Sequence, residues 1–432
     1  MKVFILTLLF IPLSLNAQDF GFGFSDSSSP ALRVNIGGEV NAELTGFFDD
    51  FATIDRMRAG SLGDIFSGSL NFDASGSAAE AVINLNLSPV FDGSSPFEID
   101  EAYVRAFFGP VTLTGGLRKL SWGKADSFGP LDVINPIDYT DLTRLSDPSS
   151  LKIARPMIHG IWSTGAFSRL EAVFVPGFQA HKFAASGRWA PSQIEDLTEL
   201  FDLEQYYRDY NNTLEYAQAG LRYTTTIGSS DLGFQYYYGR FQRPAVTLLI
   251  FPAMPAVLIP VFDFNPYHQI GFDFARVISD FNLRAEAGAN ITSDLDGKDG
   301  SIENPALFWS LGFDRDLIAG INLNLQGSGS FRLLHDRLGD SPYSDIEAGT
   351  DMTSTRITAV FSRKLFRDEI ELKATGLWGI EDSDFLIMPA LIWSRNDVTT
   401  ELSAGFFFGD RNGELGQYRD NNFMRLSLGY RL

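Results

Sequence analysis

The last ten residues of the chain are strongly two-faced and apolar up to the final residue. One set of alternate positions is apolar or aromatic: Leu426, Leu428, Tyr430 and Leu432. The other set is small, polar or basic: Arg425, Ser427, Gly429 and Arg431. Because side chains alternate between the two faces of a strand, residues 423–432 are predicted to form one. Such an ending suits the closing strand of an outer-membrane β-barrel, with lipid on one side and a polar lumen on the other.

The same alternation recurs along the whole chain. It is clearest in residues 33–44, 81–87, 281–292 and 321–333. In each segment charged, amide or hydroxyl side chains share one face and apolar side chains share the other. A soluble β-sandwich also alternates, with its polar face outside. The number and length of these segments favour the barrel, in which the polar face lines a hydrated lumen.

Short turns and long connections follow one another along the chain. The predicted turns are residues 73–78, 109–110, 166–168, 227–231, 279–280, 315–319, 365–367 and 395–397. The long connections include residues 47–66, 121–155, 176–213, 243–265, 294–303, 334–349 and 410–422. This arrangement predicts an all-β fold, a transmembrane antiparallel β-barrel of about 18 strands with periplasmic turns and long extracellular loops. Sixteen strands are the alternative, because residues 66–73 are short and residues 385–393 are apolar on both faces.

The N-terminal residues read as a secretory signal peptide. Lys2 precedes a short apolar run, and Ala17 is a small residue at a plausible cleavage point. We therefore expect residues 1–17 to be removed and residues 18–432 to form a single barrel domain in the cell outer membrane. The absence of cysteine excludes disulfides and thiolate metal sites. The formal net charge of −20 argues against nucleic-acid binding.

The connection at residues 120–145 is rich in turn residues and carboxylates, which indicates an ordered loop. One interpretation is an extracellular loop folded against the barrel wall. The other is a loop that folds inward and narrows the lumen or binds a solute. The candidate residues for that second role come from this loop and from the lumen faces of the strands before it. They are Trp122, Lys124, Asp126, Asp132, Asn135, Asp138, Arg105 and Arg118.

The same loop carries a resemblance to a known family. The Trp122-Gly123 pair and the run from Asp132 through Asn135-Pro136 to Asp138 resemble a W-G … D/N-x-x-N-P-x-D segment. That segment marks a family of large bacterial outer-membrane barrels of unassigned function. Some of its members are associated with the export of hydrophobic molecules by inner-membrane pumps of the resistance-nodulation-division type. The resemblance covers about thirty residues and implies a barrel with this loop as a marker.

Residues 244–264 form an apolar connection that contains four prolines. Because of these prolines we predict neither a helix nor a regular strand there. An apolar loop is costly in water, so we expect it to pack into the lumen, on another loop or at the lipid surface. It is interpreted either as a plug of the barrel mouth or as an apolar port for an amphipathic molecule. Its candidate residues are Leu248, Ile250, Leu258 and Ile259.

A third long connection contains helical amphipathicity between residues 191 and 210. Leu197, Leu200 and Phe201 recur at helical spacing, and Ser192 is a suitable N-cap. We predict a short helix in this extracellular loop that packs on its neighbours.

Catalytic and metal-binding patterns are weak. The chain contains no G-x-S-x-G or H-E-x-x-H motif. Its four histidines, His159, His181, His268 and His335, are dispersed in the sequence. Residues 294–300 resemble an acidic calcium loop without the spacing of an EF-hand, and a solvated turn is the preferred interpretation. We expect no enzyme activity, no cofactor and no metal site.

The predicted function is an outer-membrane channel or transporter that moves hydrophobic or amphipathic small molecules past an in-folded loop. The expected partners are outer-membrane lipid, the solute and the barrel-assembly machinery, and the resemblance adds an inner-membrane export pump. No nucleic acid is expected. Two alternatives remain: a receptor or adhesin anchored by the barrel, and an outer-membrane lipase that would use His159 or His268.

Overall fold

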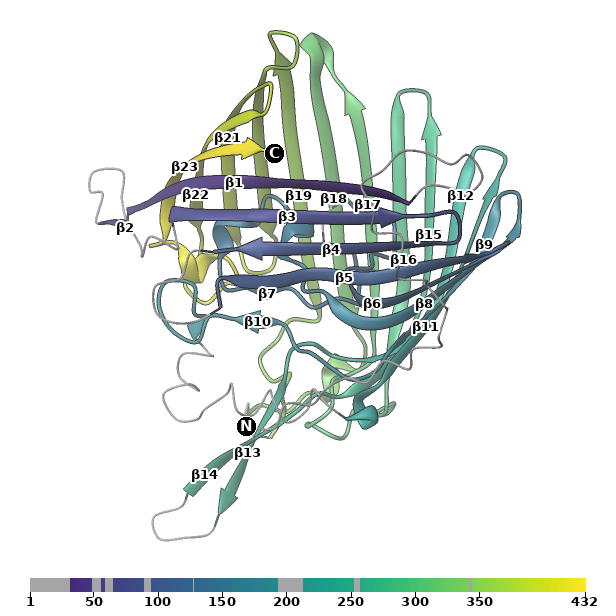
Figure 1. The fold of residues 1–432 in the computed structure, drawn as a ribbon. Coiled ribbons are helices and arrows are strands. Elements are labelled where there is room, and N and C mark those ends of the chain that lie inside the picture. Colours follow the sequence, from purple (N-terminus) through teal and green to yellow (C-terminus); the bar gives the residue numbers. More distant parts are fainter. Residues whose placement is uncertain are drawn as a thin grey trace.

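The computed structural model describes residues 32–48, 56–58, 65–88, 95–126, 128–192, 213–251, 257–341 and 344–432. Within these residues an antiparallel sheet closes on itself into a barrel of eighteen strands (Figure 1). A further strand of three residues, β2 (Arg56–Arg58), extends the sheet beside β1. The expected signal peptide lies outside the described residues, and so does almost all of the expected helix at 191–210.

The barrel strands follow one another in sequence order around the sheet. The first nine are β1 (Arg33–Phe48), β3 (Phe66–Ser75), β4 (Ala79–Leu87), β5 (Phe97–Phe108), β6 (Val111–Arg118), β8 (Arg155–Gly165), β9 (Ser168–Val175), β11 (Gln218–Ile227) and β12 (Ser230–Arg240). The last nine are β15 (Pro266–Ile278), β16 (Phe281–Thr292), β17 (Ala306–Asp316), β18 (Ile321–Arg332), β19 (Thr353–Leu365), β20 (Ile370–Gly379), β21 (Asp384–Arg395), β22 (Val398–Phe408) and β23 (Asn422–Arg431). All neighbours are antiparallel, and each position alternates between an inner and an outer face.

The barrel closes between its first and last strands. β1 pairs with β23 from Glu39 opposite Arg431 to Phe48 opposite Asn422. On its other side β1 pairs with β3. The prediction of 18 strands is therefore confirmed, and the alternative of sixteen is excluded because β3 and β21 are full strands of 10 and 12 residues.

The connections divide between two rims, as the sequence predicts. Short turns join β3 to β4, β5 to β6 and the following pairs at one end, here called the turn rim. Residues with positive φ build several of these turns, including Gly109, Ser279 and Asn396. The long connections lie at the opposite end, the loop rim, where one link is short: β20 and β21 are joined by residues 380–383. Both chain ends of the barrel lie at the turn rim, since the N–H of Leu432 donates to the carbonyl of Gly38.

The outer face of the barrel is an exposed apolar surface. The outward residues of the tail show the pattern, with Leu426 48% and Leu428 50% exposed. Inward positions of the same strands carry Glu43, Arg425 and other polar groups that make hydrogen bonds or ion pairs inside the barrel. Because exposed apolar side chains predominate on this outer face, it suits contact with lipid hydrocarbon. No helix among the described residues has the length and apolar character needed to cross a membrane.

The apolar connection at 244–264 differs from the prediction. It contains a regular antiparallel hairpin, β13 (Ala245–Phe251) and β14 (Val257–Asp263), in register from Ala245 opposite Asp263. The expectation of irregular structure was wrong because a proline is tolerated where its nitrogen need not donate to the strand ladder. The hairpin forms a separate two-stranded sheet and extends from the loop rim away from the barrel (Figure 1).

Candidate functional site

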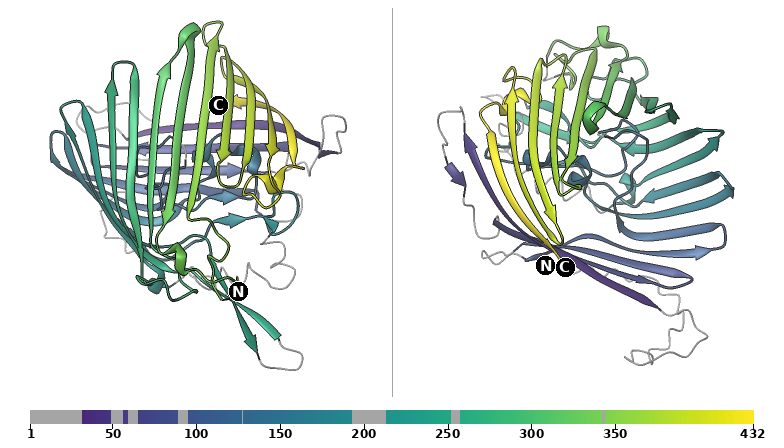
Figure 2. Two further views of the ribbon diagram at one scale, coloured as in Figure 1. Left: turned by 180° about the vertical axis from the view of Figure 1, so that it is seen from behind. Right: turned by 90° about the horizontal axis from the view of Figure 1, so that it is seen from above.

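The connection between β6 and β8 runs inside the ring of strands (Figure 2, right). Asn135, which is 2% exposed, holds it together. Its Oδ1 accepts a hydrogen bond from the N–H of Leu120 at 2.7 Å. Its Nδ2 donates to the carbonyls of Arg118 and Ile153, at 3.1 and 2.8 Å. One amide side chain thus ties together the beginning, the middle and the end of the connection.

These bonds divide the connection into two lobes, here called the first lobe (residues 121–134) and the second lobe (residues 136–152). The first lobe is held by Glu286 on the inner face of β16. The carboxylate accepts the backbone N–H groups of Lys124, of Ala125 at 2.8 Å and of Leu131 at 3.3 Å. Such charge-assisted bonds are among the strongest that a loop can form with a strand.

Gly123 shows how closely the first lobe approaches this carboxylate. Its φ of +97° lies in a region that favours glycine. A Cβ at this position would collide with Oε1 of Glu286. Glycine at position 123 is therefore required by the close packing of the loop on β16.

Asp126 extends the contact of the first lobe to the next strands. Its carboxylate forms an ion pair with Arg284 and accepts a hydrogen bond from Asn324 Nδ2 at 2.7 Å. Its backbone N–H donates to Gln326 Oε1 at 2.9 Å. Arg284 lies on β16, and Asn324 and Gln326 lie on β18. Since β18 stands across the closed sheet from β6 and β8, the first lobe reaches the far wall of the lumen.

Side-chain amides hold the carbonyl groups of the same lobe. The Nε2 groups of three glutamines donate hydrogen bonds to backbone carbonyls: Gln235 to Leu131 at 3.0 Å, Gln269 to Pro130 at 3.1 Å and Gln242 to Val133 at 3.0 Å. Gln235 and Gln269 project from the adjacent strands β12 and β15. The first lobe is therefore bound through both its donors and its acceptors.

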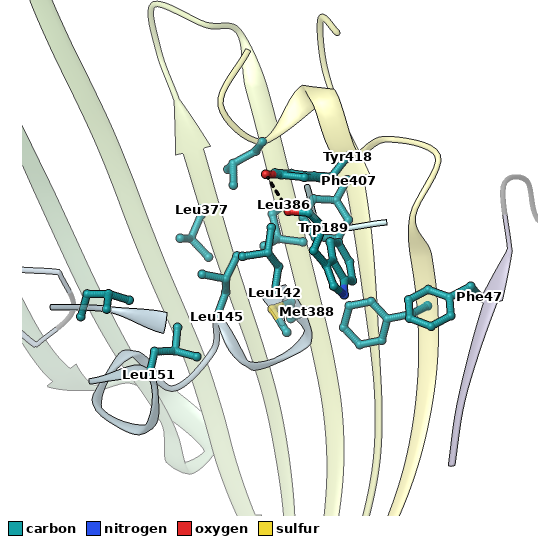
Figure 3. Close-up of a cluster of buried hydrophobic side chains, with 13 residues drawn as sticks. Phe47, Leu142, Leu145, Leu151, Trp189, Leu377, Leu386, Met388, Phe407 and Tyr418 are labelled. Carbon is teal, nitrogen blue, oxygen red and sulfur yellow. Dashed lines mark hydrogen bonds between the residues drawn. The ribbon is translucent and has the colours of Figure 1, made fainter. Parts of the chain in front are cut away.

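The second lobe meets a different wall. It contains the single-turn helix η1 (Leu142–Arg144), whose Leu142 is buried against the inner faces of β20 to β23. Figure 3 shows these side chains converging between the loop and the strands. The buried cluster comprises Phe47, Ile137, Leu142, Leu145, Leu151, Trp189, Leu377, Leu386, Met388, Phe407, Leu415, Tyr418 and Phe423. The inner face of β21 is apolar because it packs on this lobe, which explains why residues 385–393 are apolar on both faces.

Trp122 belongs to a second apolar cluster near the root of the connection. The ring is 4% exposed and shares this cluster with Met157, Tyr237 and Tyr267 of the nearby strands. Its ring packs so closely on Gly220 of β11 that a Cβ there would lie 2.7 Å from it. The indole N–H has no acceptor among the described residues. A buried donor without a partner is costly, because it has lost its hydrogen bond to water.

Two cavities flank the first lobe. The loop-side cavity, of about 420 Å³, opens among Phe128, Tyr139 and Phe241 toward the loop rim. The turn-side cavity, of about 510 Å³, extends toward the turn rim along β8, β9, β11 and β12. Both are lined by residues 121–123, so that this stretch separates them. A solute that crossed the barrel along this wall would pass Trp122.

The candidate residues predicted from the sequence divide into three groups. Trp122, Asp126, Asp132 and Asn135 line the loop-side cavity, and Arg118, Trp122 and Lys124 line the turn-side cavity. Asp138 forms an ion pair with Lys182 at 3.2 Å, next to the short parallel pairing of β7 (Asp138–Tyr139) with β10 (Lys182–Phe183). Arg105 pairs with Glu80 at 3.3 Å and lines neither cavity.

Arg118 and His159 were each named from the sequence, but the chain that they form with Glu171 in the turn-side cavity was not predicted. Arg118 lies 3.0 Å from His159 Nδ1, and His159 Nε2 lies 3.2 Å from Glu171. Because an arginine can only donate, Nδ1 accepts, and the neutral imidazole carries its proton on Nε2. His159 faces the lumen and is 1% exposed, and His268 lies on the outer face with its Nδ1 2.7 Å from the hydroxyl of Tyr236. Strand alternation places His159 inward, and the predicted turn at 166–168 pairs its strand with that of Glu171. The register that brings the three side chains together could not be predicted from the sequence.

The loop groups near the loop-side cavity have shifted pKa values. Burial, with a smaller contribution from Arg243, lowers the pKa of His181 to about 3. Its Nδ1 accepts the N–H of Ile137 at 2.9 Å, which also requires the neutral ring. Burial raises the pKa of Asp132, although its ion pair with Lys152 opposes that shift.

The acidic residues at 294–300 serve the turn that they form. Asp294 accepts the backbone N–H of Asp299 at 2.9 Å, and Asp296 forms an ion pair with Lys298. Among the described residues no three histidine, aspartate or glutamate side chains gather as a metal site.

No protein-family model matches the chain, and no curated protein matches it. Solved structures do match over nearly the whole barrel. OccK9 (OpdG) of Pseudomonas aeruginosa is 9% identical, with 92% of this chain and 98% of that chain covered and a TM-score of 0.50. The outer membrane protein opdK of Pseudomonas aeruginosa is 10% identical, with 92% and 99% covered and a TM-score of 0.50. At these identities the likeness shows the fold, a large outer-membrane β-barrel.

Proposed function

We propose that this protein is an outer-membrane channel for small amphipathic molecules, with the two-lobed connection as its constriction. One observation carries the proposal: the first and second lobes cross the lumen and are held by different parts of the wall, while cavities remain on both faces of the first lobe. A barrel of eighteen strands is wide enough for an aqueous passage unless something fills it. Here the filling is ordered and incomplete, as in a selective channel.

Removal of the constriction tests this function. Deletion of residues 124–141 takes away the contacts with Glu286 and the Asn135 tie, so the lumen should widen. Single-channel conductance in planar bilayers should rise by about twofold or more, because a barrel of this size is otherwise open. Deletion of residues 246–262 in the projecting hairpin is the control and should leave conductance unchanged. An unchanged conductance after the first deletion would exclude the constriction role.

The hairpin is proposed to supply the apolar surface at the mouth. Its strands hold Leu248, Ile250, Leu258 and Ile259, with Leu248 opposite Pro260 and Ile250 opposite Leu258. Their joint replacement by serine should weaken the flux of a hydrophobic solute, because an apolar capture surface would be lost. Small-ion conductance in the same variant should stay as in wild type. If the flux of the hydrophobic solute is equal in wild type and variant, the hairpin has no capture role and only covers the mouth of the barrel.

The receptor or adhesin alternative is favoured by one observation, the extension of the same hairpin away from the rim (Figure 1). Deletion of residues 246–262 separates the two functions. Loss of cell-surface binding with unchanged solute flux would favour the adhesin, and loss of flux would favour the channel.

The proposal includes three partners: the barrel-assembly machinery, outer-membrane lipid and an inner-membrane export pump. The two-faced C-terminal strand β23 supports recognition by the barrel-assembly machinery, and the exposed apolar band supports contact with outer-membrane lipid. Coupling to an inner-membrane export pump rests on the resemblance of the Trp122–Asp138 region alone. Cross-linking of the turn rim in whole cells would test that coupling directly.

A further inference from the structure

Aromatic and imidazole rings form much of the wall of the loop-side cavity. Its aromatic and imidazole side chains are Trp122, Phe128, Tyr139, His181, Phe241 and Tyr267. Phe241 and Tyr267 stack with their centroids 4.5 Å apart, and Tyr139 meets His181 edge-on at 5.4 Å. Flat surfaces of this kind bury the faces of ring-bearing molecules. The volume of about 420 Å³ is in the range of sites for small organic ligands.

The charged groups of this cavity cancel one another. Asp132 forms an ion pair with Lys152, and both line the cavity. Asp126 forms an ion pair with Arg284 of the barrel wall. His181 is neutral, since its Nδ1 accepts a backbone N–H. A charged solute would lose its hydration here without finding an unpaired opposite charge.

Neutral hydrogen-bond donors remain in the same walls. The indole N–H of Trp122 has no acceptor among the described residues. Because Nδ1 of His181 accepts from Ile137, its proton resides on Nε2, which is a second neutral donor. Together with the rings, these groups match a molecule that has a flat apolar face and an uncharged acceptor.

We propose that the loop-side cavity binds uncharged, ring-bearing solutes that carry a hydrogen-bond acceptor, and that the Asp132–Lys152 pair sets this preference for neutral molecules. The inference rests on the proposed channel function and adds the chemical class of its solute. The pair acts as a charge filter: each partner cancels the other, so that neither cations nor anions are favoured.

Coumarin is a suitable probe, because it is a flat, uncharged bicycle with a carbonyl acceptor. Coumarin-3-carboxylate and a trimethylammonium coumarin present the same ring with a negative or a positive charge. Equilibrium binding to the purified full-length protein is measured against protein-free detergent. Wild type should bind coumarin about tenfold or more tightly than either ion, since an uncompensated charge is disfavoured in a partly buried site. Binding of methyl glucoside is measured in the same way, because a sugar also presents a flat face but has no aromatic ring. It should bind more weakly than coumarin.

Two reciprocal substitutions test the charge filter. Asp132→Asn leaves Lys152 unpaired and should raise the affinity for coumarin-3-carboxylate about tenfold. Lys152→Gln leaves Asp132 unpaired and should raise the affinity for the cationic coumarin by a similar factor. Retained binding of neutral coumarin shows that the cavity of each variant is still formed. If both variants keep the wild-type order of affinities, the filter is refuted.

The donor is tested at Trp122. Trp122→Phe keeps an aromatic ring and removes the unpartnered N–H, so coumarin affinity should fall about fivefold. Trp162→Phe is the matched control, because Trp162 lies on the outer face of β8 and is 51% exposed. An equal effect of both substitutions would refute the donor role.

The outcomes also separate this inference from the channel proposal. Wild-type conductance without preferential binding of neutral coumarin would refute the inference and leave the channel intact. Preferential binding in a protein without conductance would support the cavity and refute the channel. Preferential binding of either ion by wild type would overturn the inference outright.

Discussion

The two lobes of one connection are held in the barrel by different physics. The first lobe is bound by directional groups, with three N–H donors around Glu286 and amide donors from Gln235 and Gln269. The second lobe is bound mainly by buried apolar side chains around Leu386 and Trp189 (Figure 3). Directional contacts define a geometry closely, and apolar burial supplies most of the free energy.

The difference matches what lies beside each lobe. Cavities flank the first lobe, where a solute needs fixed positions for its partners. The second lobe sits in a closed cluster, in which Leu386 is fully buried and Phe407 is 1% exposed. We infer that the second lobe anchors the connection and the first lobe shapes the passage.

The largest effect is expected at the apolar anchor. Leu386→Ala removes a fully buried side chain and should destabilise the seated second lobe by about 2–5 kcal/mol. Limited proteolysis within residues 136–152 should become faster. Leu391→Ala on the same strand is the control, because Leu391 faces outward and is 43% exposed. Equal protease resistance in both variants would contradict the anchoring role.

A smaller effect is expected at the polar anchor. Glu286→Gln replaces a charged acceptor of three N–H groups by an amide with a single acceptor oxygen, which should cost about 1.5–3 kcal/mol. Hydrogen exchange should rise at residues 124–131 and stay unchanged in the second lobe. Glu371→Gln, on β20, provides the control. Exchange that rises equally in both lobes would show that they move as one body.

The smallest effect is expected from pH at the boundary between the lobes. The pKa of His181 is lowered to about 3, from an ordinary value of 6.5, mainly by burial. Between pH 3 and pH 6.5, His181 is neutral while the second lobe is packed in the lumen and becomes protonated when the lobe is released. The packed state therefore binds fewer protons than the released state in this range. Its contribution to stability is complete above pH 6.5 and falls as the pH decreases toward 3. At pH 5.5 the loss should be about 1.4 kcal/mol. Proteolysis of the second lobe should be faster at pH 5.5 than at pH 7.5, and His181→Gln should remove that dependence.

The strands, and which side chains face the lumen or the lipid, could be predicted because both follow from the local alternation of polar and apolar residues. Leu426 and Leu428 point outward and Arg425 points inward, as the period of two requires. The inward turn of residues 120–145 belongs to one of two interpretations, and the contacts of Asp126 with β18 place the loop within the lumen. Its roles in constriction and solute binding remain predictions.

The partners of the connection could not be predicted, since they depend on strand register and on distant segments. Glu286 lies more than 150 residues from the N–H groups that it accepts. The inner apolar face of β21 obscured the strand pattern, because alternation fails where a lumen wall packs on a loop. The hairpin at 244–264 was missed because its prolines were taken to exclude a strand.

The apolar cluster around the second lobe has a consequence for the order of assembly. It joins Phe47 of the first strand to Phe423 of the last, with ring centroids 6.4 Å apart, across the seam where the barrel closes. Arg144 of the same lobe lies 3.9 Å from Glu43 of β1, and Thr143 accepts from Arg425 of β23. The lobe can make all of these contacts only after the last strand has met the first. Seating of the loop is thus a late event of biogenesis, and it secures the finished ring from within.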